Sequence, residues 1–157
     1  MPQPVVSIQT TSPATVLGDY HRLMNLAGYR QVIASDVDTA LKVNISWHLF
    51  YPASSTTPWQ LDGVIRAMKR DGYRPDLMHA CHNRTVVIDA HLGERENKQL
   101  HVVQQHGLRN VHLYENEEWV HIREAVGDLA DRFIALNDVY RKGFMIPRRL
   151  IGENIIH

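Results

Sequence analysis

The stretch Leu41-Lys-Val-Asn-Ile-Ser-Trp-His48 joins an apolar segment to polar side chains that can bind a ligand. Residues that alternate along a strand share one face, so Lys42 and Asn44 point to the same side. A loop then leads to a helix start, where free backbone N–H groups favour an anion. The competing interpretation is a structural lysine paired with carbonyl groups or a carboxylate. The residues expected to bind a small anionic substrate are Lys42, Asn44, His48, Thr56 and Thr57.

A second stretch, His79-Ala-Cys-His82, carries side chains that transfer protons or bind metals. Adjacent strand residues point to opposite faces, which disfavours a nucleophilic pair of Cys81 and His82. His82 and Arg84 instead follow the strand, at the edge where α/β proteins gather their sites. We expect these two to be the catalytic residues, with His82 transferring protons and Arg84 binding negative charge.

Histidine, cysteine and aspartate side chains in this region also suit a divalent metal ion. Their spacing matches no standard zinc motif, and the alternative is a strand in which Cys81 packs as a small hydrophobic residue. A divalent metal is therefore an open hypothesis, and the cofactor is otherwise unknown. The candidate ligands are His79, Cys81, His82, Asp89 and His91.

Aromatic residues surround the first stretch. They either line an apolar pocket or pack the long loop onto the following helix. The set comprises Trp47, Phe50, Tyr51 and Trp59. The sequence contains neither GxGxxG nor GxxxxGK[ST], so nucleotide binding lacks its usual support.

Alternating strands and helices must position these residues. Strands are expected at Val5–Thr10, Thr39–Ile45, Leu77–Cys81 and Asn110–Tyr114. Helices are expected between Ser12 and Gly28, between Thr57 and Gly72, and over Glu94–His106. The pattern predicts an α/β fold with a mostly parallel open sheet of about four to five strands and helices on its faces.

The geometry expected of this sheet makes the second and third strands adjacent and parallel. Lys42, Asn44 and His82 would then converge over one crevice at the carboxyl edge. Thr57 is expected to cap the middle helix, with Pro58 in its first turn and Gln60 completing a capping box.

The pattern weakens after Glu118. Trp119–Ile122 fits a short strand, Val126–Leu136 fits a strand pair or a short helix, Pro147–Ile151 fits one helical turn, and Ile155 begins another strand. We expect residues 1–157 to be a single α/β domain that is the front part of a larger protein. A missing C-terminal half would expose apolar surface and favour self-association.

Composition excludes several classes of protein. Seventeen basic and seventeen acidic residues cancel, so no overall charge favours nucleic acid or an anionic membrane. No apolar run is long enough to span a membrane. The single cysteine permits no intramolecular disulfide and favours a cytoplasmic location. It also cannot hold an iron–sulfur cluster, which takes several cysteine ligands.

Three motifs together resemble a known family. They are Lys42-Val-Asn44, Thr56-Thr-Pro58 and the ending from Ile146 to His157. The chain resembles the N-terminal part of the domain-of-unknown-function 362 family, although Val43 stands where the family has Pro. The resemblance implies an uncharacterised α/β protein, some relatives of which carry a ferredoxin-like iron–sulfur module. In that family the ending continues into a strand and a Lys-Thr-His segment that this sequence lacks.

A weaker resemblance links the chain to the lactate-racemase-type fold. It consists of Thr57-Pro58 before a helix and a strand that ends in Cys81-His82-Asn83-Arg84-Thr85. It implies that His82 belongs to a catalytic site. This sequence lacks the family's Arg before Pro58, and one residue separates His82 from Arg84.

Three classes of function remain open. The first is an enzyme, or a fragment of one, that acts on a small anionic molecule. The second is a non-catalytic binding or interaction domain. The third is a metal-binding redox accessory protein of the iron–sulfur-linked type.

Overall fold

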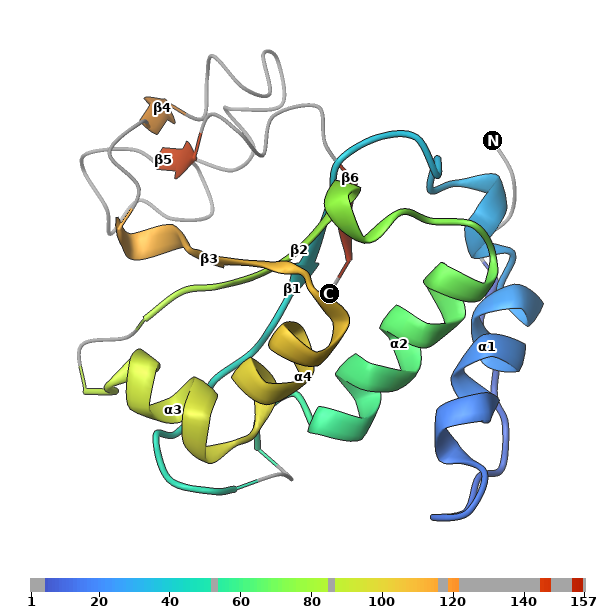
Figure 1. Cartoon of the computed structure of the whole chain (residues 1–157), viewed down its shortest axis with the longest axis horizontal. Coiled ribbons are helices and arrows are strands. Elements are labelled where there is room, and N and C mark those ends of the chain that lie inside the picture. The colour runs from blue at the N-terminus through green and yellow to red at the C-terminus, as the bar shows by residue number, and fades with distance from the viewer. Residues whose placement is uncertain are drawn as a thin grey trace.

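Parallel strands form the centre of the α/β fold in the computed structural model (Figure 1). The structure describes residues 5–51, 54–84 and 87–115, and the backbone of 119–121, 145–147 and 154–156. Strands β1 (Thr39–Lys42), β2 (Met78–His82) and β3 (Arg109–His112) lie in the order β3-β2-β1. The backbone of β6 (Asn154–Ile156) runs parallel along the other edge of β1. Strands β4 (Trp119–His121) and β5 (Met145–Pro147) pair antiparallel in a separate sheet.

The register of the parallel strands decides which side chains share a face. Lys42 is level with Cys81, and His82 is level with His112. Since successive residues of a strand alternate between faces, Lys42 and Cys81 share one face, and His82 and His112 share the other.

The helices are α1 (Val16–Leu26), α2 (Pro58–Arg70), α3 (Ala90–Glu96) and α4 (Gln99–His106), with short 3-10 turns η1 (Tyr29–Gln31), η2 (Pro75–Leu77) and η3 (Leu113–Glu115). α2 connects β1 to β2, α3 and α4 connect β2 to β3, and α1 precedes β1. α2 and α4 cover the same face of the sheet, and α1 lies along the outer side of α2 (Figure 1).

The main core lies between the sheet and α2 and α4. Leu41 and Met78 from the strands pack with Ile65 and Met68 from α2 and Val103 from α4, and all five are buried. A smaller cluster on the other face contains Ala40, Cys81 and Val111, with Leu113 packed against it. Side chains buried on both faces are typical of parallel strands.

Two features join α1 to α2. A Cβ atom added at Gly63 would overlap the ring of Tyr20, so the absence of a side chain lets the two helices approach closely. Beyond the end of α2, the Asp71 carboxylate accepts hydrogen bonds from Asn25 (2.8 Å) and from the Tyr29 hydroxyl (2.7 Å), and it contacts His21 Nε2 at 2.8 Å.

Local sequence explains where α2 begins. The Thr57 side chain accepts a hydrogen bond from the Gln60 backbone N–H at 3.3 Å, and Pro58 occupies the first helical turn. The predicted N-cap is therefore confirmed, and the cap satisfies one of the free N–H groups of the helix.

Two expectations about the elements are corrected. The sheet itself has three strands with described side chains, β1, β2 and β3, and the backbone of β6 adds a fourth at its edge. Residues 5–10 form no strand, and Val5, Val6 and Ile8 among them are exposed. The predicted helix Glu94–His106 is two helices, because Lys98 adopts a left-handed conformation (φ 65°) between α3 and α4.

Few of the predictions made for the chain after Glu118 fall on residues that the structure describes. The backbone of Trp119–His121 is a strand, as expected, and so is that of Asn154–Ile156. Pro147 lies in β5, whereas the rest of the helical turn predicted at Pro147–Ile151 lies outside the described residues. The prediction for Val126–Leu136 also lies outside them.

Candidate functional site

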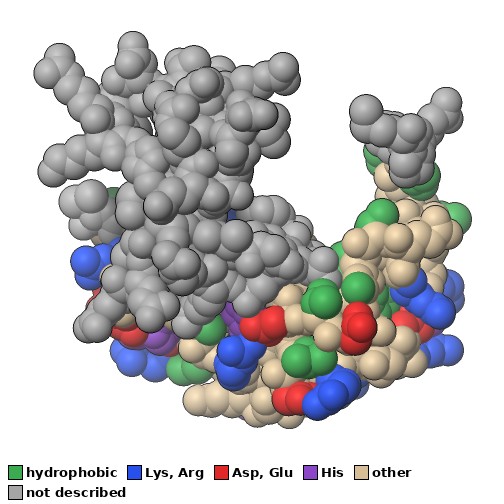
Figure 2. Space-filling view, turned by 90° about the horizontal axis from the view of Figure 1, so that it is seen from above, with side chains coloured by type: hydrophobic (Ala, Val, Ile, Leu, Met, Phe, Trp, Pro, Cys, Tyr) green, Lys and Arg blue, Asp and Glu red, His purple; other side chains and the backbone are tan. Residues whose placement is uncertain are grey.

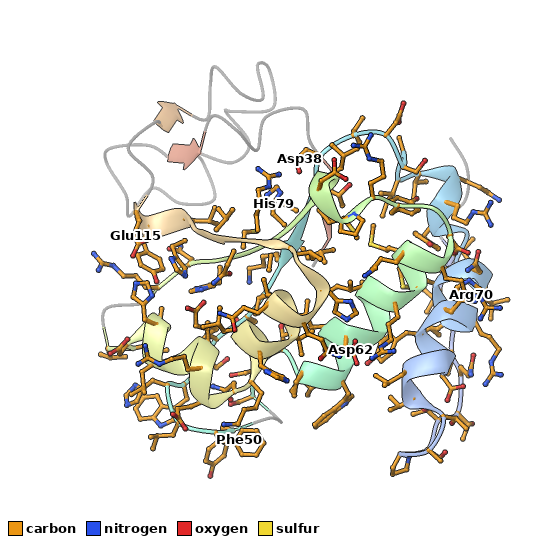
Figure 3. The ribbon with its side chains drawn as sticks, in the orientation of Figure 1. Asp38, Phe50, Asp62, Arg70, His79 and Glu115 are labelled. Carbon is orange, nitrogen blue, oxygen red and sulfur yellow. The ribbon has the colours of Figure 1, made fainter. Side chains whose placement is uncertain are left out.

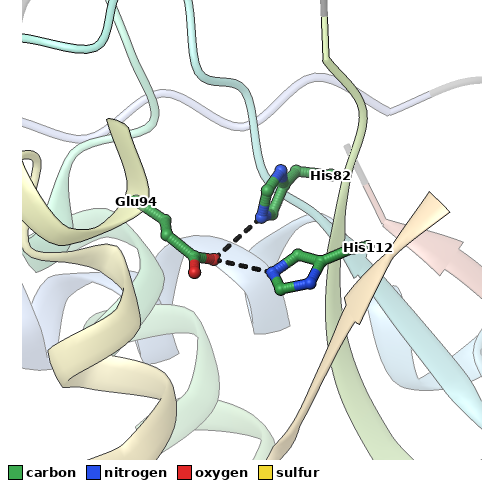
Figure 4. A group of neighbouring side chains, drawn as sticks. All are labelled: His82, Glu94 and His112. Atoms are coloured by element: carbon green, nitrogen blue, oxygen red, sulfur yellow. Dashed lines mark hydrogen bonds and ion pairs between the residues drawn. The ribbon is translucent and has the colours of Figure 1, made fainter. Parts of the chain in front are cut away.

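Two histidines and one glutamate meet at the carboxyl edge of the sheet (Figure 4). His82 ends β2, His112 ends β3, and Glu94 reaches them from α3. The Glu94 Oε2 atom lies 2.8 Å from His82 Nε2 and 3.2 Å from His112 Nε2. One carboxylate oxygen thus faces a ring nitrogen of each imidazole.

The carboxylate of Glu94 is buried, and its side chain is only 6% exposed. Asn110 also donates a hydrogen bond to Oε2, at 2.7 Å. Burial by itself raises the pKa of Glu94, but hydrogen bonds from His82, Asn110 and His112 outweigh it and lower the pKa to about 2. Glu94 is therefore a negative charge inside the protein, held there by nitrogen donors.

A second carboxylate lies on the solvent side of His112. Glu115 Oε2 is 3.0 Å from His112 Nδ1, and Glu115 Oε1 is 2.7 Å from His91 Nε2. The His112 side chain is 18% exposed, against 45% for His91 and 53% for Glu115. The hydrogen bond with His91 is the main cause that lowers the pKa of Glu115, and the one with His112 adds to it.

The residues His82, His91, Glu94, His112 and Glu115 form what we call the histidine cluster. Tyr114 and Arg84 border it. The Tyr114 ring lies 5.5 to 5.8 Å from the rings of His82, His91 and His112. The exposed Arg84 places its guanidinium 5.2 Å from the centre of the Tyr114 ring, a cation–π contact. Burial, followed by the negative charges of Glu115 and Glu94, raises the pKa of Tyr114 to about 12. Arg84 thus places a positive charge beside a group of side chains rich in carboxylate.

Local sequence sets the position of α3. Asp89 caps the helix by accepting a hydrogen bond from the Leu92 N–H at 2.9 Å. A Cβ added at Gly93 would lie 2.5 Å from Ile45 Cγ2, so glycine lets α3 approach the segment after β1. His91 and Glu94, three residues apart, share the helix face that meets β2 and β3.

The residues predicted to bind an anion hold the loop between β1 and α2 instead. Asn44 donates to Ser46 Oγ (2.7 Å) and to the Ser54 carbonyl (3.2 Å). Thr56 Oγ1 accepts from the Asn44 N–H at 2.9 Å. The Thr57 side chain caps α2, as described above.

Two further predicted residues lie apart from the histidine cluster. Lys42 ends β1 on the face of Cys81, opposite to His82, so the structure does not bring Lys42 and His82 together on one face. His48 stacks on Trp47, with ring centroids 4.8 Å apart.

The five predicted metal ligands are also separated. Cys81 and His79 share the face opposite to His82. His79 Nδ1 contacts Asp38 Oδ1 at 3.0 Å, and Arg109 also binds that carboxylate. This contact lies at the other end of the strands from Glu115 (Figure 3). Of the five, only His82 and His91 reach the cluster, and Asp89 serves as a helix cap.

The aromatic residues around the first stretch divide into two groups. Trp59 lines a cavity of about 760 Å³ together with Pro13, Val16 and Leu17. Trp47, Phe50 and Tyr51 are partly exposed on the loop, which Asn97 fastens by donating to the Trp47 carbonyl. No residue lining the cavity belongs to the histidine cluster.

Sequence reasoning missed Glu94, His112 and Glu115. The available signals were the spacing His91-x-x-Glu94, which puts both side chains on one helix face, and His112 at the end of a predicted strand. The helix predicted over Glu94–His106 includes Glu94, but the sequence pattern assigns no role in the site to that residue.

Surface charge, helix length and comparisons with known proteins add three findings. Basic and acidic side chains are interspersed on the face shown in Figure 2, in keeping with the balanced composition. Within the part of the chain that is described, no helix combines the length and apolar character needed to cross a membrane. No family model, curated protein or solved structure matched the chain.

Proposed function

We propose that this chain is an enzyme domain that binds a divalent transition metal ion with His82, Glu94 and His112 and acts on a small anionic molecule. The observation that carries the proposal is the convergence of two imidazole nitrogens on one buried carboxylate oxygen. Two histidines and one carboxylate form a donor set found in catalytic zinc and non-haem iron sites.

The spacing of these atoms suits a shared ion. Ligand atoms bound at about 2.0–2.1 Å to a tetrahedral zinc ion lie roughly 3.3 Å from one another. Glu94 Oε2 lies 2.8 and 3.2 Å from the two Nε2 atoms, and all three ligand atoms lie within 4.8 Å of one another. Small side-chain rotations would therefore open the position for a cation.

The hydrogen bonds of His82 favour the same conclusion. Its Nδ1 faces the Asn83 carbonyl oxygen at 3.4 Å, which only a protonated Nδ1 can bond. Its Nε2 lies 2.8 Å from Glu94 Oε2, where a proton on Nε2 is donated to the carboxylate. When a cation replaces that proton, Nδ1 can keep its own proton and donate it to the Asn83 carbonyl, as metal-bound histidines commonly do.

The metal would supply the chemistry, and Arg84 would supply the charge that selects the substrate. A divalent ion with a free coordination position acts as a Lewis acid and activates water. Arg84 stands beside Tyr114 and is exposed, so a carboxylate or phosphate group can reach it. Lys42 and Asn44 take no part, since they lie outside the cluster.

The competing explanation is a non-catalytic domain in which Glu94 is a structural group. Glu94 Oε2 already accepts a hydrogen bond from Asn110, and two histidines contact it. This arrangement satisfies the carboxylate without a metal. The two explanations differ in whether the purified chain binds metal ions with high affinity.

Zinc binding separates the two explanations. We expect the metal-free chain to bind Zn²⁺ in calorimetry, and His112→Ala to weaken binding at least tenfold because it removes a ligand. His101→Ala is the matched control, since His101 is an exposed residue of α4 outside the cluster. Equal affinities in all three proteins, or no binding by the wild type, would contradict the proposal.

The part of the substrate that binds Arg84 can be tested on the zinc-loaded chain. In a screen of small phosphate and carboxylate esters, we expect Arg84→Ala to raise KM severalfold for any ester that is hydrolysed. Arg95→Ala is the control, because Arg95 is an exposed arginine of α3. An unchanged KM in Arg84→Ala would remove Arg84 from the substrate site.

Two wider statements belong to this proposal. We propose that the chain is related to the domain-of-unknown-function 362 family, on the support of its Lys42-Val-Asn44 and Thr56-Thr-Pro58 motifs. We also propose a cytoplasmic location, because the single Cys81 is buried and carries no disulfide.

A further inference from the structure

We infer that the cluster holds a second cation, bound by His91, His112 and Glu115, so that His112 lies between two metal ions. This inference rests on the proposed function, since it adds an outer ion to the inner one at His82, Glu94 and His112. The three outer groups place one ligand atom each within 4.8 Å of one another.

The outer group repeats the pattern of the inner one. In each, two imidazole nitrogens face one carboxylate. Glu115 contacts His91 Nε2 at 2.7 Å and His112 Nδ1 at 3.0 Å, as Glu94 contacts His82 and His112. The outer ligands come from α3, β3 and η3, which the packing of α3 brings together.

His112 has a carboxylate at each ring nitrogen. Its Nε2 faces Glu94 and its Nδ1 faces Glu115. A neutral imidazole donates only one hydrogen bond: with the proton on Nδ1 it donates to Glu115, and its Nε2 then accepts from Asn110 Nδ2 at 3.2 Å. Cations on both sides would replace these hydrogen bonds and face a carboxylate each. Binding of the second ion would release the remaining ring proton of His112 to the solvent.

Charge and exposure favour an outer cation that substrate can reach. Two carboxylates, Glu94 and Glu115, lie within this small volume, and both contact His112. The side chains of His91 and Glu115 are about half exposed, whereas His82 is 2% exposed. The outer ion would therefore keep open coordination positions on the side of Arg84.

Counting bound ions tests this inference. The metal-free full chain is titrated with Co²⁺ alone, followed by visible absorption and by elemental analysis after gel filtration. We expect two ions per wild-type chain, with the second bound more weakly. We expect Glu115→Gln to bind one ion with the wild-type affinity of the first site and to weaken the second at least tenfold. His91→Ala should behave in the same way.

Glu96→Gln is the matched control, because it removes one carboxylate from α3 outside both groups of ligands. It should bind two ions like the wild type. One ion in the wild type would overturn the inference and leave the inner site intact, with Glu115 only a hydrogen-bond partner of His112. Two ions in Glu115→Gln would place the second ion elsewhere. No ion in the wild type would overturn the proposed function as well.

Discussion

At the scale of single residues, Asp71 shows how one carboxylate can fasten two helices. It accepts hydrogen bonds from Asn25 and Tyr29 of the α1 region and contacts His21, while it follows the end of α2. Burial raises the pKa of Asp71, but the hydrogen bonds from His21, Tyr29 and Asn25 outweigh it and hold the pKa well below its usual range. Asp71 therefore favours the folded state only while it is ionised.

Acid should remove this contribution. A carboxylate whose pKa is lower in the folded state stabilises the protein fully above its unfolded pKa, about 3.9 for aspartate. The stability is lost as the pH falls further toward the folded pKa. We expect Asp71→Asn to lower the free energy of unfolding at pH 7 and to differ less from the wild type below about pH 4. Urea unfolding across pH 2–7 measures this.

The control for this prediction is Asp36→Asn, because Asp36 is an exposed aspartate. It should follow the wild-type pH profile. If Asp71→Asn also follows that profile, the carboxylate of Asp71 does not have the role given to it here.

At the scale of elements, sequence reasoning found the features that depend on neighbouring residues. The cap at Thr57 and a strand at Leu77–Cys81, which the structure shifts by one residue to Met78–His82, could be predicted because capping and alternation act over a few positions. The contact of Glu94 with the two histidines could not be predicted from neighbouring residues. It depends on where α3 ends, and there Lys98 turns the chain. The convergence expected of Lys42 and His82 depended on the register of β1 against β2, which composition does not reveal.

The contact between α1 and α2 gives a paired prediction. Gly63→Ala should cost about 1–3 kcal/mol, because the new Cβ meets the ring of Tyr20 and overpacks the interface. Gly18→Ala in α1 should instead stabilise the protein by roughly 0.5–1 kcal/mol, since no atom lies within 4 Å of the added carbon. Chemical denaturation of both variants measures the difference. Equal effects of the two substitutions would mean that the helices do not approach closely at Gly63.

At the scale of the whole molecule, a metal bound at the cluster joins elements that come from separate parts of the chain. β2, α3 and β3 would share one ion. The ligands converge only in the folded state, so metal binding and folding are linked. The stability of the domain should therefore depend on metal concentration.

Thermal unfolding should show this dependence. At a free Zn²⁺ concentration one hundred times Kd, we expect stabilisation of about 2.7 kcal/mol and a matching rise in Tm. A chelator should reverse the rise, and His112→Ala should show only about half of it, or less, because binding that is at least tenfold weaker leaves about 1.4 kcal/mol at most. A Tm that stays the same with Zn²⁺ and with chelator would argue that the cluster is held by hydrogen bonds alone.

The most direct measurement is the position of the ion itself. Crystals of the chain grown with Zn²⁺ and measured at the zinc absorption edge should give an anomalous peak about 2.0–2.2 Å from His82 Nε2, His112 Nε2 and a Glu94 oxygen. A peak elsewhere, or no peak between these three side chains, would contradict the assignment of this cluster as a metal centre.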